Sequence, residues 1–119
     1  DIFIKILKPL TMAVYAGPSP LSMKIGLAFA AHQKPFAVCT SSGTVGHSLS
    51  HGKADAVCVY AKSCALADAA ATSIGNRIKT SQGIQAAINW GKKITGVQGL
   101  LVIVGEAMGA WGDLEVTPL

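Results

Sequence analysis

This sequence of 119 residues has few of the features that mark membrane proteins or nucleic-acid-binding proteins. No apolar stretch reaches the roughly 18 residues that a membrane-spanning helix needs, so we expect no membrane partner. The 10 cationic side chains form no run of five, and they are accompanied by only two tryptophans, two tyrosines and three phenylalanines. A surface that binds single strands interleaves aromatic and cationic residues. The sequence therefore predicts no nucleic-acid partner.

The chain is also poor in cysteine, with Cys39, Cys58 and Cys64 alone. Their number is odd and no C-x-x-C pair occurs, which argues against a zinc-thiolate site. Buried free thiols in a reducing compartment explain such residues more simply. We therefore expect a cytoplasmic protein, with Cys39 of most interest because it opens a polar loop.

What the sequence does contain is apolar material, since 50% of its residues are hydrophobic and 13% are charged. This suffices for one packed domain spanning residues 1–119. The formal charge of +4 reflects solvated surface lysines, or attraction of an anionic small molecule. The first residue is Asp1, and a strand-like apolar run follows it at once. We expect an upstream segment to be missing or removed.

The pattern of apolar residues predicts strands first, then two helices, then strands. The helices are expected at residues 64–79 and 84–94, with Ser63 and Ser81 as their N-caps. Strands are expected at residues 2–7, 11–16, 23–30, 36–40, 54–60, 100–104 and 111–116, with turns at 17–20 and 106–109. Residues 23–30 also fit a helix. This order predicts an α+β fold, a mostly antiparallel sheet with both helices packed on one face.

A hydroxyl-rich loop from about residue 40 to residue 53 is the first candidate site. Its segment Thr40-Ser41-Ser42-Gly43 offers hydroxyls and backbone N–H groups that can cradle phosphate oxygens, although such segments also form plain turns. His47 is the candidate phosphate donor or acid–base catalyst, with a solvent-exposed histidine as the alternative. Asp55 is expected to be exposed at a sheet edge or paired with Lys53.

The second candidate is the pair Asp68 and Thr72, which stand four residues apart on the first predicted helix. Residues at this spacing share one helix face. A carboxylate and a hydroxyl suit Mg²⁺ that retains water and phosphate ligands. The alternative is an acid near the helix start that the helix dipole favours.

Five segments carry a resemblance to a known family: residues 15–26 (YAGPSPLSMKIG), 39–48 (CTSSGTVGHS), 53–56 (KADA), 65–76 (ALADAAATSIGN) and 109–113 (GAWGD). They resemble an uncharacterised prokaryotic family related to ApbE, over nearly the whole chain. The resemblance implies that this chain corresponds to the C-terminal half of a longer protein. It also implies that Asp1 ends a glycine-glycine-aspartate motif.

More distantly, the chain is similar to the ApbE flavin transferases, which bind FAD, cleave its pyrophosphate with Mg²⁺ and attach FMN to a threonine. Their threonine-serine-glycine segment is similar to residues 40–43, and their metal-binding aspartate and threonine match Asp68 and Thr72. After Gly43 the chain departs from them, since only Gly46-His47-Ser48 stands where they carry a longer histidine segment. The resemblance therefore supports the metal site more directly than the reaction.

Three functions follow as hypotheses. The protein is an enzyme acting on a flavin or nucleotide phosphate with Mg²⁺, a binding module that holds FAD or FMN without turnover, or a structural subunit. The expected partners are a small phosphate-bearing ligand and another polypeptide. That polypeptide is either the missing N-terminal half or a second copy, because the first strand would otherwise leave an edge exposed.

Overall fold

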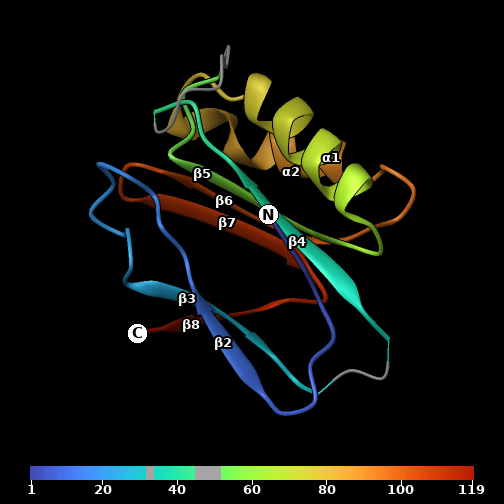
Figure 1. Cartoon of the computed structure of the whole chain (residues 1–119). Coiled ribbons are helices and arrows are strands. Elements are labelled where there is room, and N and C mark those ends of the chain that lie inside the picture. The colour runs from blue at the N-terminus through green and yellow to red at the C-terminus, as the bar shows by residue number, and fades with distance from the viewer. Residues whose placement is uncertain (32–33, 45–51) are drawn as a thin grey trace.

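A computed structural model describes residues 1–31, 34–44 and 52–119 of the chain (Figure 1). The elements follow in the order β1 (Ile2–Ile4), β2 (Leu10–Ala13), β3 (Ile25–Phe29), β4 (Phe36–Ser41), β5 (Ala56–Ala61), α1 (Cys64–Asn76), a 3₁₀ turn η1 (Ser81–Gly83), α2 (Ile84–Gly91), β6 (Val97–Val104), β7 (Ala107–Gly112) and β8 (Glu115–Pro118). None of the helices in these ranges has the length and apolarity needed to cross a bilayer.

The strands form two antiparallel sheets stacked beneath a layer of helices (Figure 1). The larger sheet has the order β1-β4-β5-β6-β7, and the smaller one has the order β2-β3-β8. Helix α1 packs on β4 and β5, and α2 packs on β6 and β7, so both helices cover the same face. The predicted α+β class is confirmed, with a division into two sheets that the sequence did not reveal.

Two apolar cores hold these three layers together. One lies between the helices and the large sheet, where Val57, Ile74 and Leu100 are fully buried. The other lies between the sheets, where Leu27 of β3 packs with Leu101 of β6. Because β5 and β6 are covered on both faces, their inner positions are apolar without alternation.

The second helix and the last strands differ from the sequence prediction. Ser81 does not cap α2: it begins η1, and α2 follows with Gly83 at its N-cap position and no side-chain cap bond. The predicted turn at 106–109 and strand at 111–116 are replaced by β7, a turn after it and the start of β8. Gly109, which the sequence predicts in a turn, lies in β7 beneath α2. A Cβ there would come within 2.7 Å of Ile84 and Ile88 side chains.

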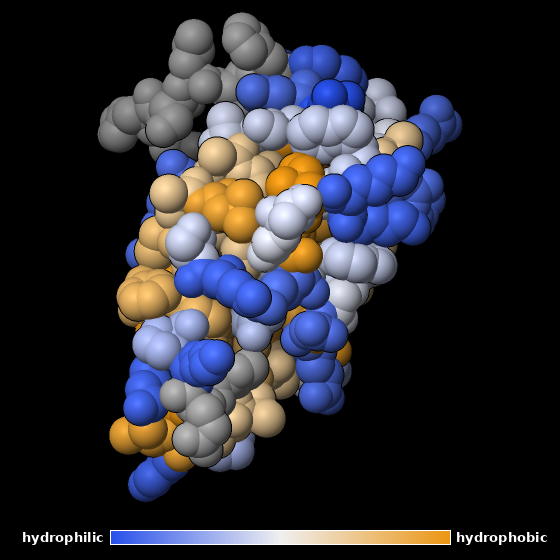
Figure 2. Space-filling model, turned by 90° about the vertical axis from the view of Figure 1, so that its right-hand side faces the viewer, coloured by the Kyte–Doolittle hydropathy of each residue, from blue (hydrophilic) through white to orange (hydrophobic). Residues whose placement is uncertain are grey.

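The edge of the large sheet at β1 carries exposed apolar side chains. Ile2 and Phe3 are 47% and 59% exposed, and Leu7 beyond the strand is 79% exposed. Figure 2 shows one face of the molecule, on which hydrophobic surface is open between groups of hydrophilic residues. Such an edge is a template for pairing with another strand, so the association with a second polypeptide stays a prediction.

Candidate functional site

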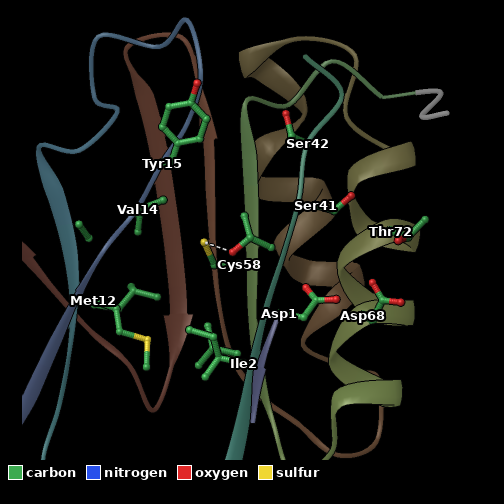
Figure 3. Close-up of a pocket in the computed structure, with 14 residues that line it drawn as sticks. Asp1, Ile2, Met12, Val14, Tyr15, Ser41, Ser42, Cys58, Asp68 and Thr72 are labelled. Atoms are coloured by element: carbon green, nitrogen blue, oxygen red, sulfur yellow. Dashed lines mark hydrogen bonds between the residues drawn. The ribbon is translucent and has the colours of Figure 1, made fainter. Parts of the chain in front are cut away.

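A cleft of about 520 Å³ opens beside the C-terminal end of β4, and most of the predicted site residues line it (Figure 3). One side of the cleft is polar and the other is mainly apolar. The polar residues are Asp1, Thr40, Ser41, Ser42, Asp68 and Thr72, and the apolar side includes Ile2, Met12, Val14, Leu27, Val38 and Cys58. The space is of the size that small-ligand sites have.

Helix α1 supplies the acid and one hydroxyl. Ser63 caps its start by accepting a hydrogen bond from the backbone N–H of Leu66 at 3.2 Å. The alanines of α1 that face the sheet are buried, which lets the helix lie close to β4 and β5. Asp68 and Thr72 are exposed on another side of the helix, toward the cleft.

Asp68 is the fifth residue of α1, so it lies beyond the first turn. The alternative in which it is an acid favoured by the helix start therefore lacks its geometric basis, because that effect fades after the first turn. Within the described part of the chain, no hydrogen bond or ion pair engages the side chain of Asp68 or Thr72. Both oxygen groups are thus accessible to a ligand in the cleft.

Strand β4 contributes hydroxyls from both of its faces. Cys39 belongs to the core under the helices and Val38 to the core between the sheets, so alternate residues of β4 point in opposite directions. Ser41 therefore faces α1, whereas Thr40 faces the smaller sheet. β1 pairs only with residues 36–38 of β4. The edge beyond them is open on that side, which lets the cleft reach both faces of the strand.

A buried carboxylate, Asp55, anchors the loop that follows β4. Thr44 Oγ1 donates a hydrogen bond to Asp55 Oδ1 at 2.8 Å, and the N–H of Gly105 donates one to Oδ2 at 2.8 Å. Ser42 Oγ accepts a bond from the N–H of Thr44 at 3.0 Å. Asp55 is 7% exposed and its two oxygens accept hydrogen bonds from Thr44 and Gly105, so the expectations of an exposed edge residue and of a partner of Lys53 were both wrong.

Three glycines bring the base of this loop against the end of α1. The backbone oxygen of Gly52 lies where a side chain on Gly43 would be, and that of Gly75 lies where one on Gly52 would be. The N–H of Gly43 donates to the carbonyl of Ala54 at 2.9 Å. The three backbones are thus too close to admit a Cβ at Gly43 or Gly52, which fixes the loop base next to the helix.

The structure places the predicted site residues as follows. Thr40, Ser41 and Ser42 line the cleft together with the acid–hydroxyl pair of α1, whereas Gly43 contributes backbone at the loop base and does not line it. His47 lies outside the described residues, so its role stays a prediction. Sequence reasoning missed Asp1 as a lining residue, although its place at the end of an expected motif was a signal.

Cys58 forms part of the cleft floor and accepts a hydrogen bond from Thr40 Oγ1 at 3.4 Å. Burial raises the pKa of the Cys58 thiol to about 11, from an ordinary value of 9.0, and the Thr40 bond offsets only part of this rise. The folded protein therefore holds this proton more tightly than the unfolded chain does.

We expect the melting temperature to fall as the pH rises from about 9 to about 11. Below pH 9 the thiol is protonated in both states and Cys58 adds no pH dependence; above it, only the unfolded chain readily loses the proton. The loss attributable to Cys58 is about 2 kcal/mol of unfolding free energy. Thermal melts across this pH range should show that the melting temperature falls less steeply with pH in Cys58→Ala than in the wild type. Burial also raises the pKa values of Cys39 and Tyr60, so some decline persists in the variant. Equal slopes in the two proteins would contradict the assignment.

The residues present fit Mg²⁺ better than a thiolate-bound metal. In the ranges that the structure describes, no group of three histidine, cysteine or acidic side chains is arranged to hold a metal ion. Mg²⁺ does not require one, because it commonly takes one or two carboxylates and fills its other positions with water and phosphate oxygens. Asp68, with Thr72 beside it and Asp1 on the same cleft, meets that requirement.

The protein has an α+β fold, with a cleft of the size that small-ligand sites have at the edge of its helix-covered sheet. Comparison with known families identifies the family of the chain. A family described as AbpE bacteria matches residues 1–110, and the chain belongs to this family.

Several archaeal proteins are similar to the chain over most of its length. It is 42% identical over 118 residues to a UPF0280 protein of Methanococcus aeolicus, a match that covers 96% of this chain and 48% of the relative. A UPF0280 protein of Methanosarcina acetivorans is 41% identical over 108 residues, covering 90% of this chain and 42% of the relative. The chain thus spans about half the length of the relatives it matches.

Proposed function

We propose that the cleft binds a flavin nucleotide such as FAD or FMN through its phosphates, with Mg²⁺ held by Asp68 and Thr72. The observation that carries this proposal is the meeting of three features in one cleft: an acid–hydroxyl pair on α1, hydroxyls of β4 and an apolar wall. The resemblance to the ApbE flavin transferases supports the choice of ligand.

Each group has a defined task in this proposal. Ser41 donates a hydroxyl hydrogen bond to a phosphate oxygen, and Thr40 does so once its hydroxyl turns away from Cys58 Sγ. The wall that includes Met12 and Val14 receives the flat ring. Asp68 and Thr72 hold the metal, which when bound neutralises phosphate charge and favours displacement at phosphorus. The resulting activity is a pyrophosphate-cleaving transferase that would use an FAD-like substrate.

Binding without turnover is the second candidate, and the character of the cleft favours it. Among the described residues that line the cleft, Asp1 and Asp68 supply the carboxylates. If both are committed to metal binding, proton transfer must come from another residue. His47 is the candidate in this sequence.

Titration of the purified protein with FAD and FMN, with and without Mg²⁺, tests the proposal by flavin fluorescence. We expect quenching that is stronger with Mg²⁺, because the metal joins the carboxylate to the phosphates. Release of FMN and AMP from FAD, followed by chromatography, separates the enzyme from the binding module. The absence of quenching in both conditions would contradict the proposal and favour a structural subunit.

A further inference from the structure

Two cysteines, Cys39 of β4 and Cys64 at the start of α1, are neighbours between the large sheet and the helix. The thiol of Cys39 donates a hydrogen bond to the backbone carbonyl oxygen of Cys64 at 3.7 Å, and Cys64 packs against the core to which Cys39 belongs. Cys39 is fully buried, whereas Cys64 is partly exposed. Cys58 belongs to the core on the opposite face of the sheet, so it is separated from this pair.

The two cysteines lie along the same contact between α1 and β4 that holds the acid and hydroxyls of the cleft. On α1, Cys64 precedes Asp68 by four residues, and Thr72 follows after four more, so the three lie along one side of the helix. On β4, Cys39 and Ser41 both face α1. The pKa of Cys39 is raised, chiefly by burial and next by Cys64, with a smaller contribution from Asp68. The thiols are therefore neighbours of the candidate metal site.

We propose that Cys39 and Cys64 are a redox-sensitive pair that a small-molecule disulfide, such as glutathione disulfide, converts to an intramolecular disulfide. The thiolate of the more exposed Cys64 attacks one sulfur of the oxidant, forming a mixed disulfide and releasing one glutathione. Cys39 then loses its proton and attacks the Cys64 sulfur, releasing the second glutathione. The protein loses two hydrogen atoms, and the oxidant is reduced to two thiols.

The division of roles follows from exposure. Small reagents reach Cys64 first because Cys64 is partly exposed, whereas Cys39 is fully buried. Once Cys64 carries a leaving group, Cys39 is already beside it. The reverse order would require a bulky reagent to enter the core.

Formation of the bond also alters the cleft, and this part of the inference rests on the proposed function. An S–S bond is about 2.0 Å long, much shorter than a contact between two thiols, so it draws the first turn of α1 toward β4. Asp68 lies one turn further along the helix and moves relative to Ser41. Because displacement by about 1 Å is costly for a positioned site, we expect Mg²⁺-dependent flavin affinity to fall about tenfold or more on oxidation.

The experiment treats the reduced protein with glutathione disulfide at neutral pH, denatures it with an alkylating reagent, and measures intact mass and linked peptides. We expect loss of two hydrogens, one alkylated thiol at Cys58, a link between Cys39 and Cys64, and reversal by dithiothreitol. Cys39→Ser should stop at a glutathione adduct on Cys64. Cys64→Ser, at a more exposed position, should form neither adduct nor link and provides the test if Cys39→Ser does not fold. Cys58→Ala should still form the link.

A wild-type protein that stops at the glutathione adduct, or in which all three thiols stay alkylatable, would overturn the thiol pair whatever the cleft binds. A complete link that leaves Mg²⁺-dependent FMN affinity unchanged would overturn its control of the cleft. If the reduced protein binds no flavin nucleotide, the proposed function fails, and the mass measurement still decides the thiol chemistry.

Discussion

Asp68→Asn is expected to weaken Mg²⁺-dependent flavin-nucleotide binding by about 100-fold or more, since even residues that only support a metal ligand contribute 10- to 100-fold. The carboxylate is exposed on the cleft side of α1 and makes no contact that holds the fold. The melting temperature should therefore change little, as is usual for exposed positions. Fluorescence titration and thermal melting on the same sample give both results.

Asp113→Asn is the matched control, because it makes the same chemical change at an exposed acid outside the cleft. It should leave flavin affinity unchanged. If Asp68→Asn lowers stability while its Mg²⁺-dependent binding matches that of the wild type, the metal site does not exist at this position. Most of the case for phosphate chemistry would fall with it.

Asp55→Ala should destabilise the protein strongly, by about 3 kcal/mol, through the loss of two hydrogen bonds to a buried carboxylate. The substitution leaves the N–H of Gly105 and the hydroxyl of Thr44 without an acceptor. For a domain of this size, the expected decrease in melting temperature is about 10 °C. Thermal or urea unfolding measures the effect.

Asp55→Asn should recover part of this loss. Its amide oxygen can still accept from Gly105, and the Thr44 hydroxyl can turn to accept from the amide nitrogen. Asp113→Ala is the control for removal of an exposed acid. Equal stability of Asp55→Ala and wild type would show that the Asp55 network does not anchor the loop.

The strands and helices that could be predicted are those whose residues face a core. The apolar run of β6 and the alanine-rich helix α1 follow from burial, and Ser63 marks the helix start by its side chain. The division into two sheets could not be predicted, because it depends on long-range pairing such as β3 with β8. Gly109 led to a wrong prediction of a turn. Its lack of a side chain instead leaves room for α2 to pack on β7.

The residues of the candidate site could be predicted only where their spacing in the sequence or the family resemblance indicates them. Asp68 and Thr72 share a side of α1 by helical geometry alone. That β4 would bring Ser41 beside them depends on how the helix packs across the sheet, which no local pattern encodes. The apolar wall includes Met12 of β2 and Leu27 of β3 together with residues of β1, β4 and β5, and the sequence around each of them is typical of ordinary core. The role of Asp55 depends on Gly105, fifty positions away in the chain.

The pairing of β3 with β8 has a consequence for biosynthesis. Ile25 is opposite Pro118, so β3 gains its second neighbour only after the residues up to Pro118 have been translated. Until then, β2 and β3 form a sheet of two strands only, and a pair of strands alone is marginally stable in water. Completion of the smaller sheet is thus a late step that joins distant segments, and such steps are slow. A nascent chain stalled before Glu115 should remain sensitive to protease in the β2–β3 region while the longer elements are protected.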